Sequence, residues 1–463
     1  MKIFLVQPPI EDFYTTPIRL FPLGLFYLGS YLKSFNHEVL ILDSLQPFRK
    51  RKIPFPEEFL YLKEYYSGDQ ENLLFKNYWH YGMDIREIVI QAQEYRPDLI
   101  GISSNFTAYF SSVKELACAL KKVFPNTPLV LGGAHATVCF SEILKQLPEV
   151  DYIVTGEGER PLAALTECLQ KGKDFSNIEG LAYRYKGLIR VVPVKKVFNW
   201  ESINLDYNLL LNSYKYMVGR KKAVSMISSR GCPFPCSFCG VSNVFGKKIR
   251  YRNSTDLVQE MVILRQRWGI ELFNFEDDNI SLDRDWFADF LCKIQNCPEL
   301  KGIELTAMNG LCFHTLDRKI INLMRRAGFI RLNLSLVSDD QDLLSSVQRL
   351  WRKEYLEEIV GYASAEGFMV SVYIIVGLPG QTSKKLMETI DYLMKMKVLV
   401  GPSVFYPVPG TSVTRDCQDR GLLEGKTWSH YRSSAFSVET PQLSRKELFN
   451  IVNYCRKKSL AVL

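Results

Sequence analysis

The stretch RGCPFPCSFCG, residues 230–240, places Cys232, Cys236 and Cys239 on one short loop. It follows AVSMISS, residues 223–229, a run of apolar and small residues that is typical of a buried strand. Where strands and helices alternate to form a barrel, the loops at the carboxyl ends of the strands carry the chemistry. We therefore expect these three thiols to belong to a reactive site at the end of the first strand of such a barrel.

Three thiolates on one tight loop suit a four-iron cluster, because they can hold three irons and leave the fourth open to a small molecule. The alternative is a structural zinc site, which is closed by four ligands and usually contains two Cys-x-x-Cys pairs. The sequence offers no second pair near the first, and Cys292 and Cys297 lie far along the chain in or just after an expected helix. The pattern favours the open cluster over zinc.

The region around the cysteine loop repeats the alternation of strands and helices. Five more runs read as strands, namely residues 270–277, 302–308, 330–336, 370–380 and 401–410. With residues 223–229 they predict a partial (β/α)6 barrel over 221–410, followed by a tail over 411–463.

The first part of the chain also alternates strands and helices, but here the pattern predicts an open sheet and not a barrel. Five expected strands cover residues 2–8, 37–43, 97–104, 127–133 and 150–158. They predict a doubly wound, Rossmann-like α/β domain over 1–190, with a hairpin that turns at Lys186 and Gly187 and a linker over 191–220. Residues 44–83 are aromatic, charged and aperiodic, so we interpret them as an insertion. Its aromatic part near residues 58–82, with the aromatic tail, could line a large apolar pocket.

Composition limits the class of protein. The chain has 463 residues, 47% of them hydrophobic, which predicts two or three domains with well-filled cores. Its 58 basic and 50 acidic residues are intermixed, so the net charge of +8 gives little reason to expect a nucleic-acid partner. No run reaches the roughly 18 apolar residues that a membrane span requires, and eleven cysteines in such a chain indicate free thiols, so we expect a cytoplasmic protein.

The cysteine loop, CPFPCSFC, resembles that of the radical S-adenosylmethionine enzymes, with an aromatic residue just before the last cysteine. The resemblance implies a [4Fe-4S] cluster on the three cysteines that binds S-adenosylmethionine and cleaves it to a 5'-deoxyadenosyl radical. It also implies an external one-electron reductant, such as flavodoxin or ferredoxin, and an organic substrate that the sequence leaves unknown.

Three later motifs fit the same family in order and spacing: FNFEDDN at 273–279, YIIVGLPGQT at 373–382 and YPVPGT at 406–411. Taken alone, the acidic run could instead cap a helix, a role that residues 279–283 could also fill. The fourth expected strand departs from the family, because LNLSLVS lacks the Gly-x-Glu-Ser motif that touches the ribose. By resemblance, the residues that would contact S-adenosylmethionine are Phe238, Glu276, Asp277, Ser335, Gly377 and Pro379.

The first 190 residues resemble the cobalamin-binding domain that precedes the cluster domain in one branch of this superfamily. The motifs are PDLIGISS, LGGAHAT and VDYIVTGEGE, and small residues at strand ends would let a flat corrin approach the backbone. The alternative is a sheet that only docks the barrel. For Glu157, the alternative is a role in capping the helix that follows it. The Asp-x-His-x-x-Gly motif, which supplies a histidine ligand to cobalt in other corrinoid proteins, is absent, so we expect no histidine ligand from that motif. By resemblance, cobalamin would contact Ser103, Ser104, Gly132, Gly133, His135, Thr137 and Glu157.

Together the two resemblances imply cobalamin-dependent methyl transfer to an unactivated carbon. Relatives that cyclise, rearrange or oxidise their substrates provide an alternative within the same chemistry. Methylthiolation of transfer RNA is disfavoured, since Cys118, Cys139 and Cys168 are scattered and do not form a second trio. A non-catalytic corrinoid sensor or carrier is the alternative from another class, and the cysteine trio is evidence against it.

Overall fold

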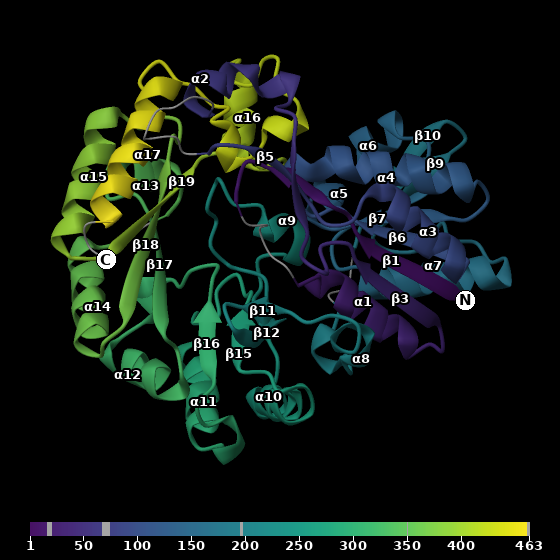
Figure 1. Cartoon of the computed structure of the whole chain (residues 1–463), viewed down its shortest axis with the longest axis horizontal. Helices are drawn as coiled ribbons and strands as arrows, with labels where there is room; N and C mark the ends of the chain where they lie inside the picture. Colours follow the sequence, from purple (N-terminus) through teal and green to yellow (C-terminus); the bar gives the residue numbers. More distant parts are fainter. Residues whose placement is uncertain (16–20, 67–74, 195–197, 350, 461–463) are drawn as a thin grey trace.

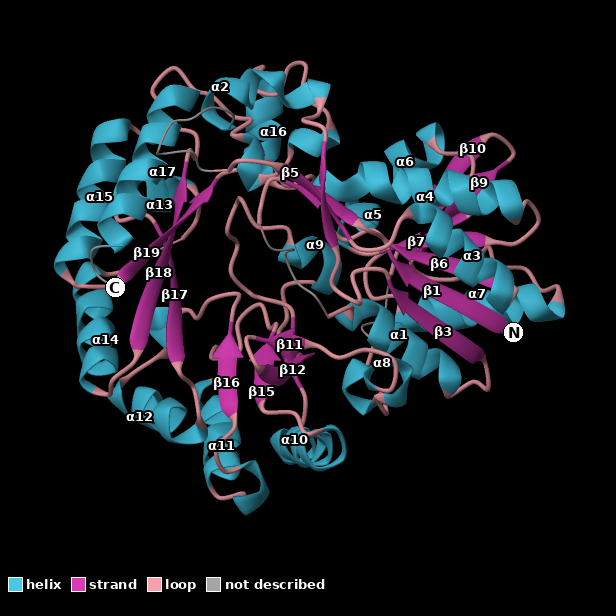
Figure 2. Ribbon diagram, in the orientation of Figure 1, coloured by secondary structure: helices cyan, strands magenta, loops and turns pink. Residues whose placement is uncertain are grey.

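The computed structural model describes residues 1–15, 21–66, 75–194, 198–349 and 351–460 (Figure 1). Each predicted region has residues outside these ranges: 16–20 and 67–74 in the first domain, 195–197 in the linker, 350 in the barrel and 461–463 in the tail. The α/β architecture agrees with the prediction, with one sheet near the N-terminus and a strand–helix series after it (Figure 2). No helix among the described residues is long and apolar enough to span a membrane.

The first sheet has seven strands, in the order β10-β9-β8-β7-β6-β1-β3. Five are parallel: β1 (Lys2–Gln7), β3 (Glu38–Asp43), β6 (Leu99–Ser103), β7 (Leu129–Gly132) and β8 (Tyr152–Val154). The hairpin of β9 (Leu181–Tyr185) and β10 (Leu188–Val191) extends the sheet antiparallel, and it turns at Lys186 and Gly187 as the sequence predicts.

Helices cover both faces of this sheet because its strands are apolar on both sides. Ile3 and Leu5 pack with α1 (Leu23–Lys33) and α7 (Glu159–Lys171). Phe4 and Val6 pack on the opposite face, in a second core that also takes side chains of α3 (Ile85–Tyr95), α4 (Phe110–Val123) and α6 (Phe140–Gln146).

The strand order reverses direction next to β1. From β1 the chain goes first to β3 on one side and later to β6 on the other, so the connections leave the carboxyl ends of β1 and β6 in opposite directions. A crevice forms at such a switch point, and it is where open α/β sheets bind ligands. The fold therefore places Ser103 and Ser104 beside a crevice.

The second half forms the predicted partial barrel of six parallel strands. Three strands make one sheet, β12 (Lys221–Met226), β15 (Leu272–Phe275) and β16 (Glu304–Ala307), which β11 (Met217–Val218) extends antiparallel. Three make the other sheet, β17 (Arg331–Val337), β18 (Met369–Val376) and β19 (Leu399–Val404). Only single bridges, such as Leu311 to Leu334, join the two sheets among the described residues.

Helices follow the barrel strands and cover the outside of the barrel. They are α10 (Ser254–Trp268), α11 (Arg284–Gln295), α12 (Arg318–Ala327), α13 (Gln341–Ser346), α14 (Lys353–Ala365) and α15 (Ser383–Lys395). Figure 1 shows this outer layer most clearly where α12, α14 and α15 run along the edge of the molecule. The open side of the barrel faces the first sheet, with the short α9 (Val241–Phe245) between them.

The aperiodic insertion is more ordered than its sequence indicates. Its strands β4 (Lys50–Ile53) and β5 (Tyr78–Tyr81) form a small antiparallel sheet with β2 (Ile10–Asp12), and η1 (Glu57–Leu62) and α2 (Lys63–Tyr66) lie between them. Phe59, Tyr66, Tyr78 and Tyr81 of these segments are buried, whereas Phe48 is exposed, so burial follows no simple alternation along the insertion.

The tail after the barrel packs on both halves of the molecule. It contains α16 (Ser412–Asp419) and α17 (Arg445–Leu460), and α17 covers β19 and α15. Tyr65 of the insertion stacks on Phe449 of α17, with their ring centroids 4.1 Å apart. Insertion and tail therefore meet each other where α2 packs against α17, at the top of the view in Figure 2.

Candidate functional site between the two domains

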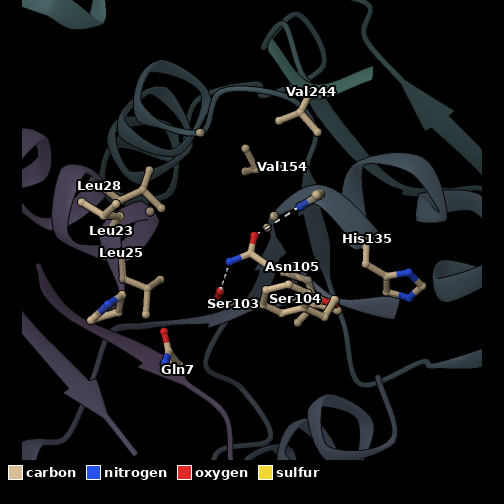
Figure 3. A pocket seen from close by; sticks show the side chains of 18 of the residues that line it. Gln7, Leu23, Leu25, Leu28, Ser103, Ser104, Asn105, His135, Val154 and Val244 are labelled. Atoms are coloured by element: carbon tan, nitrogen blue, oxygen red, sulfur yellow. Dashed lines mark hydrogen bonds between the residues drawn. The ribbon is translucent and has the colours of Figure 1, made fainter. Parts of the chain in front are cut away.

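A cavity of about 460 Å³ lies between the first sheet and the barrel (Figure 3). The sheet contributes the segments after β1, β6, β7 and β8, which is the switch-point crevice that the topology creates. The barrel contributes Arg230, Gly240, Glu276 and Asp278, among others. None of the described residues of the insertion 44–83 lines this cavity, so the expectation that the insertion lines the large pocket is wrong for this cavity.

Six of the seven residues expected to contact cobalamin line the cavity. They are Ser103, Ser104, Gly132, Gly133, His135 and Glu157. Gly132 has open space where a side chain would stand, since the nearest atom to a Cβ there would be 3.9 Å away. Gly133 has a φ of +112°, and a Cβ would lie 2.4 Å from Oδ1 of Asn105, so only glycine fits there.

Thr137 holds two of the cavity loops together. Its hydroxyl donates to the carbonyl of Gly133 at 2.8 Å and accepts from the amide of Gly156 at 2.9 Å. It is the one residue of the expected cobalamin set that does not line the cavity.

His135 forms part of the cavity wall. It is buried, its Nδ1 lies 3.1 Å from the hydroxyl of Thr107, and its ring packs against Phe110 and Trp428. Burial lowers the pKa of the imidazole to about 4, so the ring is neutral at pH 7. Figure 3 shows the ring turned away from the middle of the cavity.

Glu157 takes part in a buried ion-pair network and does not merely cap a helix. Arg230 donates to Glu157 at 2.9 Å and to Glu159 at 2.7 Å, and Arg250 also donates to Glu157 at 2.9 Å. Because Arg230 comes two residues before Cys232, the network joins the first domain to the cysteine loop. Sequence reasoning missed both arginines, which have no motif of their own.

The cysteine loop runs between β13 (Ser229–Arg230) and α9, and all three thiols are half-buried. Gly231 allows the backbone to turn sharply from β13 into the cysteine loop. Its φ is +91°, and there is no room for a Cβ because the carbonyl oxygen of Lys248 would be 2.5 Å away. Arg349 donates to the sulfur of Cys236 at 3.7 Å, and burial raises the pKa of the Cys239 thiol to about 11. A buried thiolate without a partner is costly, which is why the thiol holds its proton. A bound metal ion would replace the proton and stabilise the thiolate.

Among the residues that the structure describes, no three His, Cys, Asp or Glu side chains are arranged around a single metal ion. A four-iron cluster makes a different demand, because its three thiolates bind three different irons and therefore stand farther apart than the ligands of one ion. Three half-buried thiols on one loop fit such a cluster by the chemistry of their donor atoms.

The carboxylates of the acidic run at the end of β15 take two different positions. Glu276 and Asp278 line the cavity, and Asn274 donates to Glu276 at 2.6 Å. Asp277 is buried below them and accepts bonds from the backbone and hydroxyl of Ser228 and from the hydroxyl of Ser229, at 2.5 to 3.1 Å. Burial raises the pKa of Asp277 to about 6 despite these bonds. The helix cap is supplied separately by Asp283, which accepts from the amide of Trp286.

Phe238, Ser335, Gly377 and Pro379 do not line this cavity. Ser335 and Gly377 lie toward or just beyond the carboxyl ends of β17 and β18, and Phe238 is partly buried against the core. Gly377 has a φ of +94°, its amide donates to Gln381, and a Cβ there would lie 3.1 Å from Leu448 of α17. Packing of the tail therefore provides a structural reason for this glycine.

Asn105 is a cavity residue that sequence reasoning missed. Its Nδ2 donates to the hydroxyl of Ser103 at 3.1 Å, and its Oδ1 accepts from the amide of Ala134 at 3.3 Å, so it bridges the ends of β6 and β7 (Figure 3). The sequence did contain a signal for this role, because Asn105 directly follows Ser104 at the end of a strand.

Two protein-family models match the chain. The B12 binding domain matches residues 75–166, and the radical SAM superfamily matches residues 226–393. The first match covers part of the seven-stranded sheet, and the second covers four of the six barrel strands, β15 to β18, together with the last residue of β12.

Curated relatives cover most of the chain at low identity. An uncharacterized methyltransferase of Pyrococcus horikoshii is 26% identical over 93% of this chain and 86% of its own length. Cytidylyl-2-hydroxyethylphosphonate methyltransferase of Streptomyces wedmorensis is 25% identical over 91% of this chain and 83% of its own length. Anaerobic magnesium-protoporphyrin IX monomethyl ester cyclase of Synechocystis is 27% identical over 75% of this chain and 63% of its own length.

A solved structure shares the whole arrangement. The radical S-adenosylmethionine methyltransferase TsrM of Kitasatospora setae, solved with cobalamin and a [4Fe-4S] cluster bound, superposes with a TM-score of 0.70 at 18% identity, over 94% of this chain and 85% of TsrM. This likeness establishes the fold, and the two family models identify its parts. The chain therefore combines a B12 binding domain with a radical SAM domain, the pairing of domains found in cobalamin-dependent radical S-adenosylmethionine enzymes.

Proposed function

We propose that this protein transfers a methyl group to an unactivated carbon of an organic substrate, with cobalamin and S-adenosylmethionine as cofactors. The observation that carries the proposal is a cavity that residues of both domains line. It is lined on one side by Ser103, Ser104 and Gly132 and on the other by Glu276 and Asp278. Two cofactors held by these opposite walls would reach one common space.

The cluster would be held by Cys232, Cys236 and Cys239. Gly240, which directly follows the last cysteine, lines the shared cavity, so the loop borders the space where the substrate would react. When bound, the cluster with S-adenosylmethionine supplies a hydrogen-abstracting radical, and the corrinoid supplies the methyl group. Reduction would come from an external one-electron donor such as flavodoxin or ferredoxin.

The corrinoid would lie against the ends of β6 and β7. Gly132 leaves the space that a flat ring needs, Gly133 lets the backbone turn sharply, and Asn105 holds the two strand ends together. We assign residues 1–190 to this domain and residues 221–410 to the radical domain. The division follows the limits of the two sheets and leaves 191–220 as the linker and 411–463 as the tail.

The residues around the reacting centre keep it dry and fixed. Asp277 ties the end of β15 to the end of β12 through Ser228 and Ser229, which fixes the point where Glu276 and Asp278 enter the cavity. Apolar side chains of the barrel, including Ile227, Val241 and Val244, make up much of the opposite wall. Exclusion of water protects reactive intermediates and strengthens the polar contacts that remain.

A second reaction type deserves a direct test, because one of the similar relatives is a cyclase. The protein would be supplied with cobalamin, a reductant and S-adenosylmethionine labelled on its methyl group. Label on the recovered cobalamin, together with 5'-deoxyadenosine, supports methyl transfer. 5'-Deoxyadenosine without labelled cobalamin supports cyclisation, rearrangement or oxidation, and neither product would support a sensor or carrier.

The corrinoid site itself is tested by Gly132→Val. A Cβ at this position comes no closer than 3.9 Å to any atom, so we expect the chain to fold and keep its iron, while the isopropyl group occupies space that the corrin needs. We expect the cobalt content to fall by about tenfold or more. As a matched control, Gly24→Ala changes a second glycine of the cavity wall that also has open space but lies on α1. Full cobalt content in Gly132→Val would place the corrinoid elsewhere.

A further inference from the structure

We propose that residues 427–434 of the C-terminal tail, here called the strap, form the outer support of the cobalamin cavity, with Trp428 and Arg432 as positioning residues for corrinoid binding. The inference rests on the proposed function insofar as this cavity takes cobalamin. The strap lies outside both regions that match family models, 75–166 and 226–393.

The strap meets the segment 105–110, which joins β6 to α4. Four residues of this segment line the cavity, namely Asn105, Phe106, Thr107 and Tyr109. The segment is a loop and a single helical turn, so no sheet hydrogen bonds fix it in place. Its position depends on what packs behind it.

Trp428 packs behind the cavity wall at His135. Its indole meets the imidazole of His135 edge to face, with centroids 4.7 Å apart, and meets Phe110 in the same way at 4.9 Å. His135 in turn contacts the hydroxyl of Thr107 through Nδ1 at 3.1 Å. The indole therefore clamps the β7 side of the cavity to the segment after β6.

Arg432 holds the other end of the segment. Its guanidinium is buried and donates to the carbonyl of Ala108 at 2.6 Å and to the carbonyl of Glu11 at 2.7 Å. It lies 3.6 Å from the carboxylate of Asp12. Ala108 stands between Thr107 and Tyr109, so this bond fixes two cavity residues at once.

Asp12 completes the buried cluster. It accepts from the hydroxyl of Tyr109 at 2.7 Å and from the hydroxyl of Ser434 at 2.7 Å. A buried ion pair is stable only when its remaining polar atoms are hydrogen-bonded, and here the partners come from the first domain and from the strap. Loss of the arginine would leave the buried Asp12 carboxylate without its cation and would remove one donor each from the carbonyls of Glu11 and Ala108.

The strap is also bonded to the barrel. The amide of Val404, at the end of β19, donates to the hydroxyl of Ser433 at 3.0 Å. The strap that supports the wall of the cobalamin cavity is thus itself hydrogen-bonded to the radical domain. A strap in this position couples corrinoid binding to correct docking of the two domains.

The test uses the full-length protein with four variants: Trp428→Ala, Trp428→Phe, Arg432→Gln and, as control, Tyr454→Phe. Tyr454 belongs to the same tail but bonds Asp391 on the outside of the barrel, at 2.5 Å. Each protein is reconstituted anaerobically, iron and cobalt are measured per chain, and hydroxocobalamin is titrated by absorbance. Melting of the apo-proteins is followed by circular dichroism.

We expect Trp428→Ala and Arg432→Gln to bind hydroxocobalamin about tenfold more weakly or worse, with iron content unchanged. Trp428→Phe, which keeps a ring against His135, should recover most of the affinity, and Tyr454→Phe should match the wild type. Wild-type affinity in both Trp428→Ala and Arg432→Gln would overturn the proposal. A parallel loss of iron and cobalt would also overturn it, since the strap would then serve only general folding. Absence of cobalamin binding in the wild type would instead refute the proposed function, and this inference with it.

Discussion

At the scale of single residues, Cys236 occupies the most constrained position of the cysteine loop. Its sulfur accepts from Arg349, its carbonyl accepts from the amide of Cys239, and Ser237 beside it donates to the carbonyl of Val347. These contacts tie the middle of the loop to the segment after α13. The sequence predicted the loop and its thiols from their spacing, but Arg349 is more than a hundred residues away and carries no signal of its own.

Cys236→Ala should keep the fold and lose the cluster. The change removes one thiolate of three and no core packing, so we expect an unchanged circular dichroism spectrum, loss of most bound iron and no detectable 5'-deoxyadenosine. Cys297→Ala is the matched control, because this thiol is also half-buried but lies far from the loop along the chain and donates to Glu299. The ligand assignment fails if Cys236→Ala retains a full complement of iron.

His135 predicts how stability responds to acid. Its pKa is lowered by burial to about 4 in the folded chain, against an ordinary value of about 6.5 when unfolded. Between these values only the unfolded chain takes up the proton, so the contribution to stability is complete above pH 6.5 and falls as the pH drops towards 4. Between pH 6.5 and pH 5 the loss is about 2 kcal/mol from this residue.

Urea unfolding of the first domain at several pH values measures this loss. His135→Gln removes the titrating group and should flatten the dependence between pH 6.5 and pH 5 relative to the wild type, whatever its effect at pH 7. An identical slope in both proteins would show that His135 is solvated and titrates normally.

At the scale of elements, most of the sheet and barrel could be predicted because each strand shows its own pattern. The runs at residues 2–8, 37–43 and 97–104 are apolar on both faces, as β1, β3 and β6 require. The insertion could not be predicted in the same way. Its strand β5 is the short run YWHY, which is defined by its partners β2 and β4 rather than by any alternation of its own.

The structure brings the predicted site residues to the cavity mainly where they follow a strand end, and their roles there stay a prediction. Ser103, Ser104 and Gly132 lie at carboxyl ends of neighbouring parallel strands, so topology alone brings them to one cavity. Asp277 has the same kind of position, yet its side chain turns inward to Ser228 and Ser229. Which of three consecutive carboxylates faces the cavity depends on the twist of the strand end, and the sequence does not reveal it.

The ion-pair network between the two domains predicts a large cost for one substitution. Arg230→Met would leave Glu159 buried without its cation and weaken the contact to Glu157, and such a loss costs about 3 to 5 kcal/mol. Chemical denaturation should detect the loss. Arg420→Met removes an exposed pair with Asp416 and should cost less than about 1 kcal/mol. Equal effects of the two changes would contradict a structural role for the buried network.

At the scale of the whole molecule, the arrangement brings three separate parts of the chain to one cavity. The first sheet supplies its crevice, the barrel supplies the cysteine loop and the acidic run, and the tail supports the wall. The two domains could be predicted because each has a self-contained pattern. Their docking could not, because it depends on Arg230, Trp428 and Arg432, which are single residues distributed over two hundred positions.

The most direct test of the account is metal analysis of the protein purified anaerobically from cells supplied with cobalamin, followed by an assay for 5'-deoxyadenosine after reduction. We expect about four iron atoms, a matching amount of sulfide and about one cobalt per chain, with 5'-deoxyadenosine formed from S-adenosylmethionine. Four irons without cobalt would contradict the central claim, because the first domain would then be only a scaffold and methyl transfer through a corrinoid would have to be abandoned.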